Sequence, residues 1–202
     1  MIFDQIHANK GTLKYCIRWE SDETVTAAQR DKIATLTSRV INNWNAQLAG
    51  YDNWPYSTIT VKVTGWAVKN RATLAWSDTS VPIYVGDLDD GGAPQCASGT
   101  FNMSLWGTKG WTGGAGGDWG QRVGSTYILN SLDLDEPHII EHEIGHGFNL
   151  PDFYDANQFP PTGLPLTIMQ AGASSRITAW DKWMIRRVWS ELLRAKPSRF
   201  GR

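Results

Sequence analysis

The amino-acid sequence lacks long apolar runs and lacks an excess of either charge. No apolar run in the 202 residues approaches the roughly 18 residues needed to span a bilayer, so we expect no membrane partner. The 19 basic and 20 acidic side chains leave a net charge of -1, which gives no electrostatic reason to propose nucleic acid as a partner. The first residues contain no basic-then-apolar signal segment, although this does not exclude secretion.

Cysteine is also scarce. Cys16 and Cys96 are the only two, and a bond between them would close a long loop and add about 4 kcal/mol of stability through loop entropy. Two buried thiols are the alternative, because two cysteines alone do not identify an oxidising compartment. We favour the disulfide, which is typical of a secreted protein.

Tryptophan and glycine, by contrast, are abundant. The sequence has 11 Trp and 20 Gly in an otherwise ordinary soluble composition, with 41% hydrophobic and 19% charged residues. The length suffices for one domain with a sizeable core, and we expect most tryptophans to lie in that core. Contact with carbohydrate is the alternative for any tryptophan on the surface.

Hydrophobic periodicity predicts both helices and strands. An apolar stripe at helical spacing predicts a long helix over 26–48, with Thr26 and Gln29 forming a capping box at its start and Gly50 just beyond its end. Alternating or short apolar runs predict strands, and these cover residues 11–19, 57–68, 81–87, 100–107 and 122–129.

Two loops between these strands have compositions that also occur in ligand sites. The acidic residues of 87–94 could hold calcium, but their spacing does not fit the EF-hand pattern, and a solvated turn is the better interpretation. Residues 109–120 form a glycine-rich loop with no following lysine, so this loop is not a P-loop. Its glycines permit tight turns and close approach of the backbone.

Two further helices are predicted in the last third of the chain. Acidic residues followed by a proline mark the start of a helix over 137–148. Residues 150–175 show little periodicity and are predicted to be irregular. Thr178, with Asp181 three residues on, predicts the cap of a closing helix over 179–194.

The helix over 137–148 contains the pattern His-Glu-x-x-His. His142 and His146 are four residues apart, so a helix places them on one face, where both imidazoles can reach one metal ion. Glu143 lies about 100° further round the helix, poorly placed as a ligand but close enough to contact a water on the metal. A chance match on a helix without metal is the alternative.

A third ligand must come from elsewhere, and the chain has only four histidines. His138 is about 12 Å along the helix axis from His146, too far to share one ion, and His7 fits no pattern. Asp152 can approach the ion if the chain reverses after the helix. Asn149 suits that reversal, because asparagine tolerates left-handed backbone better than other non-glycine residues. Asp152 is therefore the preferred third ligand, with a surface turn residue as the alternative.

These residues resemble the extended motif HExxHxxGxxH of the metzincin clan of zinc endopeptidases, in the form that ends in aspartate. His142, Glu143, His146 and Asp152 match the motif, whereas Asn149 departs from its glycine. The aspartate form is similar to that of the small secreted snapalysin-type proteases. Those proteases tend to have a proline before the aspartate and a tyrosine after it, as the sequence PDFY has here.

The clan has a second mark, a tight turn with a methionine beneath the metal. TIMQAG at 167–172 resembles this turn, with Met169 in the methionine's place. The alternative for Met169 is an ordinary core methionine. Tyr154 could stabilise the oxyanion of the reaction, or it could be a packing residue.

The order of the predicted elements also resembles the clan. The resemblance implies an α+β, metzincin-like zincin with a twisted mixed sheet, a backing helix over 26–48, an active-site helix, and a small lower part with a C-terminal helix. It implies a single catalytic domain over 1–202, with an upper part over about 1–149 and a lower part over about 150–202. The motifs themselves cover only 142–172.

The chain is also similar to a group of secreted fungal and bacterial proteins, for which no substrate is implied. The shared features are the stretch GGAGGDWGQRVGS at 113–125 and, near the C-terminus, Trp183, Met184 and Arg186. Many metzincins begin with a pro-segment whose cysteine caps the zinc. Neither Cys16 nor Cys96 has the flanking residues of that pattern.

The resemblance implies a zinc-dependent endopeptidase. One catalytic Zn²⁺ would be held by His142, His146 and Asp152, and Glu143 would act as general base for the attacking water. The substrate would be a peptide or protein that lies extended along an edge strand, for which we select residues 100–107. We expect a secreted monomer, with no nucleic-acid or membrane partner and with no calcium requirement supported by the sequence.

A function of another class is also open. The chain could be a non-catalytic, tryptophan-rich binding protein of the extracellular matrix or cell wall that keeps structural zinc. Glu143 argues against this alternative, because structural zinc does not need a base. A zinc hydrolase that acts on another amide or ester is a third option, and no feature of the sequence distinguishes it.

Overall fold

One mixed β-sheet organises the molecule. In the computed structural model, which describes residues 1–200, six strands run in the order β5-β3-β1-β6-β8-β7. Neighbouring strands are parallel, except that β7 is antiparallel to β8. The predicted α+β class with a mixed sheet is therefore confirmed. The strands are β1 (Thr12–Glu20), β3 (Thr60–Val68), β5 (Ile83–Val85), β6 (Met103–Thr108), β7 (Gly114–Gly117) and β8 (Gly120–Gly124).

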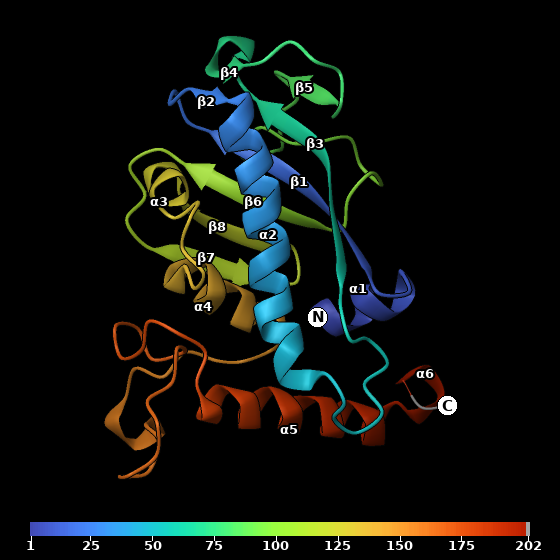
Figure 1. The fold of residues 1–202 in the computed structure, drawn as a ribbon, viewed down its shortest axis with the longest axis vertical. Helices are drawn as coiled ribbons and strands as arrows, with labels where there is room; N and C mark the ends of the chain where they lie inside the picture. The colour runs from blue at the N-terminus through green and yellow to red at the C-terminus, as the bar shows by residue number, and fades with distance from the viewer. Residues whose placement is uncertain (201–202) are drawn as a thin grey trace.

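The long helix predicted over 26–48 is confirmed as α2 (Ala27–Leu48), which crosses one face of the sheet (Figure 1). Its capping box forms as expected: Gln29 N donates to Thr26 Oγ1 over 3.2 Å, and Thr26 N donates to Gln29 Oε1 over 2.9 Å. Gly50 has a left-handed φ of 73° just beyond the helix end. The apolar stripe faces the core, where the buried side chains are Ile33, Leu36, Val40, Ile41, Trp44 and Leu48.

The two helices predicted in the last third are also confirmed. They are α4 (His138–Gly147), which packs on β7 and β8, and α5 (Ala179–Ala195), which crosses below the end of α2 (Figure 1). Thr178 and Asp181 form the predicted capping box at the start of α5. Between α4 and α5 the chain is irregular apart from the short turn η2 (Ala156–Gln158). A four-residue helix, α6 (Pro197–Phe200), follows.

Glycines allow α4 to lie directly against the edge strand β7. A Cβ atom at Gly116 would overlap the backbone carbonyl of Glu143, and a Cβ at Gly114 would overlap its carboxyl group. Only glycine permits this approach. The prediction of a loop over 109–120 is wrong for the residues that form β7. The sequence of this strand, Gly-Ala-Gly-Gly, has no alternation of apolar and polar residues, so the pattern could not predict a strand there.

The choice of residues 100–107 as the substrate-binding edge is also wrong. The strand in that segment, β6, lies between β1 and β8, so both of its edges are already paired. The strand predicted over 122–129 ends early, since β8 stops at Gly124 and a short helix, α3 (Ser125–Asn130), follows.

The structure also contains elements that the sequence pattern did not predict. Helix α1 (Ile2–Ala8) buries Ile2, Phe3 and Ile6 in the core. A small second sheet pairs β2 (Val25–Thr26) with β4 (Leu74–Ala75), which follows the short turn η1 (Arg71–Thr73). These strands are too short to give a readable period.

The predicted disulfide between Cys16 and Cys96 is present. It joins β1 to the loop after β5, with a Cα–Cα distance of 6.0 Å, and both residues are buried. In the acidic loop over 87–94, Asp89 Oδ1 accepts hydrogen bonds from the backbone N–H groups of Gly91 and Ala93. This carboxylate oxygen therefore stabilises the turn by accepting hydrogen bonds from its backbone.

Most of the tryptophans lie in the core, as expected from the composition. Trp111, Trp119 and Trp183 are the exposed ones among residues 1–200. No helix in that part of the chain is both long and apolar enough to cross a membrane. The buried tryptophans are Trp19, Trp44, Trp54, Trp66, Trp76 and Trp189.

Candidate metal centre

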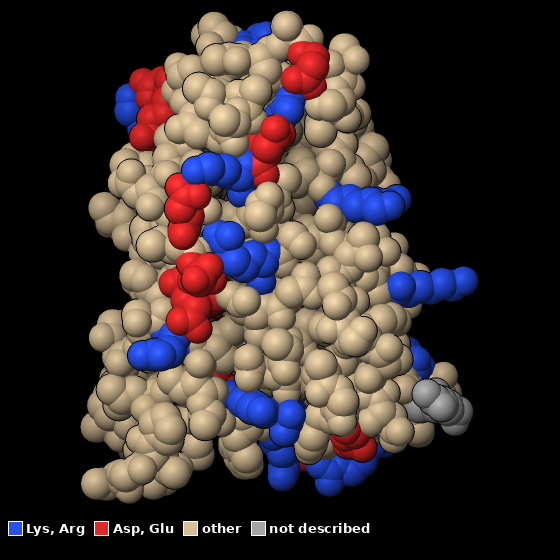
Figure 2. All heavy atoms as spheres, viewed as in Figure 1, with Lys and Arg blue, Asp and Glu red and all other residues tan. Residues whose placement is uncertain are grey.

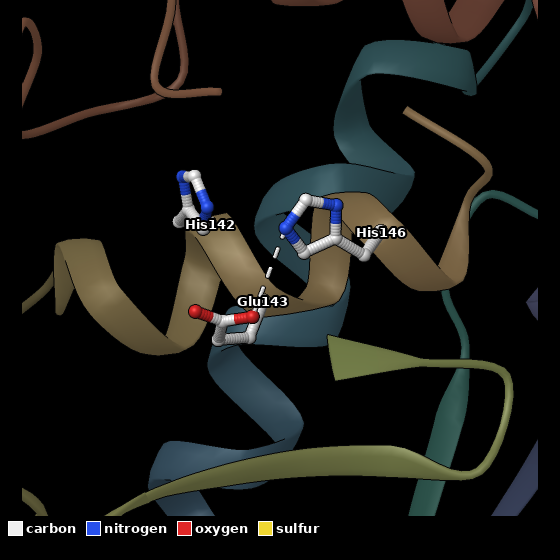
Figure 3. Close-up of side chains that lie close together, drawn as sticks. All are labelled: His142, Glu143 and His146. Carbon is white, nitrogen blue, oxygen red and sulfur yellow. Dashed lines mark ion pairs between the residues drawn. The ribbon is translucent and has the colours of Figure 1, made fainter. Parts of the chain in front are cut away.

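Helix α4 brings three potential metal ligands together. The rings of His142 and His146 have centroids 4.9 Å apart, and Glu143 Oε2 lies 3.8 Å from His146 Nε2 (Figure 3). One ligand atom from each of these three residues lies within 4.8 Å of the others. The cluster could therefore hold a metal ion, as the spacing on a helix predicts.

Backbone carbonyl groups fix the orientation of both imidazoles. His142 Nδ1 lies 2.7 Å from the carbonyl oxygen of Ile168, and His146 Nδ1 lies 2.8 Å from that of Leu150. A carbonyl oxygen only accepts, so each Nδ1 carries the proton and donates it. Each Nε2 then faces the cluster as the free nitrogen, the arrangement that is usual for histidine ligands of metals.

Asp152 lies beside these two nitrogens. Its Oδ1 is 3.0 Å from His142 Nε2 and 3.5 Å from His146 Nε2. This oxygen is buried and has no hydrogen-bond partner among residues 1–200. It is closer to both nitrogens than Glu143 Oε2 is to His146, so it is the better placed of the two carboxylates to share an ion with them.

The turn after α4 delivers Asp152 through the backbone geometry expected at Asn149. Asn149 has a φ of 68°, so the predicted left-handed conformation is confirmed. Asn149 N donates to the carbonyl of His146 over 2.9 Å, and Leu150 N donates to that of Gly145 over 3.1 Å. This pair of hydrogen bonds is a Schellman motif, which ends the helix and reverses the chain.

Glu143 is buried beside the cluster. Its side chain is only 6% exposed, and burial raises the pKa of its carboxyl group to about 7, with the Asp152 carboxylate acting in the same direction and His142 in the opposite one. A carboxyl group with such a pKa can both take up and release a proton near neutral pH.

Met169 lies beneath α4 as a fully buried side chain. A Cβ atom at Gly145 would overlap its sulfur, so the helix rests on the methionine without an intervening side chain. Phe153 N donates to the carbonyl of Met169 over 3.1 Å. The turn that contains Met169 therefore contacts both α4 and the segment that carries Asp152.

Asp181 anchors this turn, a role that the sequence pattern did not reveal. Its carboxylate is fully buried and accepts hydrogen bonds from the hydroxyl of Thr167 and from Ile168 N, the latter over 3.1 Å. It also accepts from Thr178 N over 2.8 Å. Because the Ile168 carbonyl holds His142, Asp181 indirectly positions that imidazole. The sequence predicts the capping box that Asp181 forms with Thr178, but it does not predict the hydrogen bond between Asp181 and Thr167.

The other candidate residues lie outside the cluster or at its rim. Tyr154 is 69% exposed, and the neighbouring Asp152 carboxylate raises the pKa of its hydroxyl. His138 does not join the cluster, and its Nδ1 lies 3.5 Å from the hydroxyl of Tyr127. His7 stacks on Trp189, with ring centroids 5.5 Å apart.

Two cavities meet at the cluster. One of about 350 Å³ extends toward Ile139, Ile168 and Gly172, and one of about 400 Å³ extends along β7 toward Asp152. Both are lined by the same four residues, Gly114, His142, Glu143 and Tyr154. The histidines and Glu143 therefore lie in the middle of a longer cleft between β7 and the irregular segment after α4.

No family model matches this sequence, and no curated protein matches it. The interpretation of the cleft therefore depends on the geometry of its own residues.

Proposed function

We propose that the protein is a zinc-dependent endopeptidase of the metzincin type. In this proposal His142, His146 and Asp152 are the metal ligands and Glu143 is the general base. The observation that carries the proposal is that two imidazole Nε2 atoms lie within 3.5 Å of one buried carboxylate oxygen, which has no hydrogen-bond partner among residues 1–200.

The distances among these donors fit a zinc ion. In a tetrahedral site with bonds of about 2.0 Å, two ligand atoms lie about 3.3 Å apart, and Asp152 Oδ1 lies 3.0 Å from His142 Nε2 and 3.5 Å from His146 Nε2. With each Nδ1 donating to a carbonyl, the lone pairs of two neutral imidazoles would face a carboxylate oxygen. That arrangement is unfavourable unless a cation lies between them.

Glu143 would handle the protons of the reaction. When bound, Zn²⁺ lowers the pKa of a water molecule and polarises the scissile carbonyl group. Glu143 would take the proton from that water and pass it to the leaving amine. The burial of this carboxyl group beside the cluster, which raises its pKa above the usual range, supports its uptake of that proton.

The edge strand β7 is the proposed binding site for the substrate backbone. β7 is the last strand in the sheet order, so one of its edges has no strand partner among residues 1–200, and it borders both cavities. An extended peptide could pair with it as an additional strand. Because three of its four residues are glycine, side chains would hinder this approach very little. Ile139 and Ile168 would then contact an apolar side chain of the substrate.

The remaining parts of the proposal concern Met169, Tyr154 and the cellular location. Met169 would support the histidines from below, as the methionine of the metzincin turn does. Tyr154, exposed at the rim, would donate a hydrogen bond to the oxyanion. The buried disulfide between Cys16 and Cys96 supports folding in an oxidising, extracellular compartment. We propose that the protein acts there as a monomer.

Peptide cleavage with measured zinc content tests the proposal. The zinc-loaded protein should cleave members of a broad peptide library, and Glu143→Gln should keep its zinc while losing at least about 10²-fold in kcat. Asp152→Asn should instead lose zinc affinity. Folded, zinc-loaded protein that cleaves no peptide would exclude the endopeptidase and favour the tryptophan-rich binding protein with structural zinc.

A further inference from the structure

A third cavity lies away from the metal centre, on the solvent-facing side of α5. Its volume is about 420 Å³, larger than either cavity at the cluster. The lining residues are Tyr51, Ala179, Lys182, Trp183, Arg186, Arg187, Ser190 and Arg194. We call this hollow the α5 cavity.

Positive charge gathers in the α5 cavity although the whole chain has a net charge of -1. Four of its lining residues are basic, and Figure 2 shows blue side chains grouped at the lower end of the molecule, where α5 lies in Figure 1. Two carboxylates face them: Glu191 pairs with Arg187 and Arg194, and Asp52 accepts from Ser190. Cations therefore outnumber carboxylates at this site.

The structure holds one of these cations in a fixed position. Arg186 Nε donates to the carbonyl of Gln47 over 2.7 Å, and its guanidinium lies 4.6 Å above the ring of Tyr51. Within residues 1–200, neither Arg186 nor Lys182 forms an ion pair. A guanidinium held in this way, without a carboxylate partner, can form two parallel hydrogen bonds to an incoming carboxylate or sulfate group.

An aromatic side chain completes the site. Trp183 is 55% exposed, and its ring is stacked on that of Trp180 with centroids 5.1 Å apart. The stacked partner limits the movement of the exposed ring. An indole face of this kind can pack against the apolar face of a sugar ring.

We propose that the α5 cavity binds an anionic polysaccharide, one that carries carboxylate or sulfate groups. The basic residues from Lys182 to Arg194 extend over about 18 Å of helix, which suits a chain of several sugars. An acidic peptide fits less well, because the cavity offers neither an edge strand nor an apolar groove. A membrane surface also fits less well, because the site is hollow and Trp183 is the only exposed large apolar side chain of α5.

Binding to defined polysaccharides tests this proposal without reference to peptidase activity. The zinc-free protein is titrated with polygalacturonate, which carries carboxylates, with heparin, which carries sulfates as well, and with neutral dextran. Binding to either anionic chain, with none to dextran, is expected. The polymer that binds more tightly at physiological salt identifies the preferred anion.

Two variants and one control separate a built site from general attraction of opposite charges. Lys182→Gln/Arg187→Gln and Trp183→Ala should each weaken binding by at least about tenfold. Lys32→Gln/Lys109→Gln removes the same charge from exposed residues that do not line the cavity, and it should weaken binding by less than about twofold. Thermal unfolding verifies that all three variants are folded.

Three results would overturn the proposal. Equal weakening by the control variant would mean that only overall charge matters. An unchanged affinity of Trp183→Ala would exclude sugar stacking. Tighter binding to polyglutamate or to phosphatidylserine vesicles than to both polysaccharides would assign the cavity to an acidic peptide or to a membrane.

Discussion

Asn149 offers the sharpest test of how Asp152, the proposed third ligand, is delivered to the cluster. Its φ of 68° is a conformation that costs a residue with a Cβ atom about 1–2 kcal/mol. Asparagine bears less of this cost than alanine, so Asn149→Ala should lower the free energy of unfolding by about 1 kcal/mol. For a domain of this size, that corresponds to a decrease of about 2–4 °C in Tm.

Replacement by glycine should behave differently. Asn149→Gly removes the strain in the folded state but increases the conformational freedom of the unfolded chain. These effects oppose each other, so the free energy of unfolding should stay within about 0.5 kcal/mol of wild type. The expected order of stability therefore puts asparagine and glycine together, with alanine below both.

The same turn leads into two groups that contact His146. The carbonyl of Leu150 accepts from its Nδ1, and the carboxylate of Asp152 lies beside its Nε2. Relaxation of the turn in Asn149→Ala should therefore also weaken zinc binding, by about fivefold if the whole 1 kcal/mol is expressed at the site. Calorimetric zinc titration and thermal unfolding of the zinc-free protein measure the two effects separately.

Asn157→Ala is a matched control, because Asn157 is an exposed asparagine within η2 and has no left-handed φ. This control should leave both Tm and zinc affinity unchanged. An Asn149→Ala protein with wild-type Tm, or a glycine variant less stable than the alanine variant, would refute the role assigned to this turn.

Four further changes have defined outcomes. Asp181→Asn should lower Tm and weaken zinc binding together, because the amide group cannot accept all the hydrogen bonds that hold Thr167 and Ile168; a fall in Tm with unchanged calorimetric zinc affinity would contradict the link to His142. Gly116→Ala should cost about 1–3 kcal/mol by overpacking β7 against α4, as measured by urea unfolding, and should reduce peptide cleavage. Cys16→Ser/Cys96→Ser should lower the free energy of unfolding by about 4 kcal/mol, again measured in urea. Burial lowers the pKa of His7 in the folded protein, so the unfolded chain binds a proton more readily. The free energy of unfolding should therefore fall as the pH drops below 6.5. His7→Phe should remove this contribution to the pH dependence of Tm, as measured by thermal scans.

Local interactions explain which parts of this protein could be read from its sequence. The caps at Thr26 and Thr178 join residues three apart, and the left-handed turn at Asn149 depends on one residue's backbone preference. The spacing of His142 and His146 likewise needs only a helix. Such features depend on neighbours in the chain, so the sequence predicts them without knowledge of the fold.

Contacts between distant segments of the chain decided the parts of the fold that the sequence did not predict. The strand β7 has almost no side chains, and it forms where α4 approaches it closely and β8 pairs with it. The position of β6 inside the sheet follows from pairing with two strands distant in sequence. Strand order is set by such long-range pairings, which hydrophobic alternation does not specify.

The proposed metal site depends on both local spacing and long-range contacts. The sequence alone determined that His142 and His146 share one helix face and that Asp152 follows a turn able to reverse the chain. Only the tertiary structure decided that the carbonyl of Ile168 orients His142, that Asp181 anchors this turn, and that β7 rather than β6 borders the cleft. The physical reason is that these groups meet through contacts between distant segments, and a sequence pattern records only the spacing within each segment.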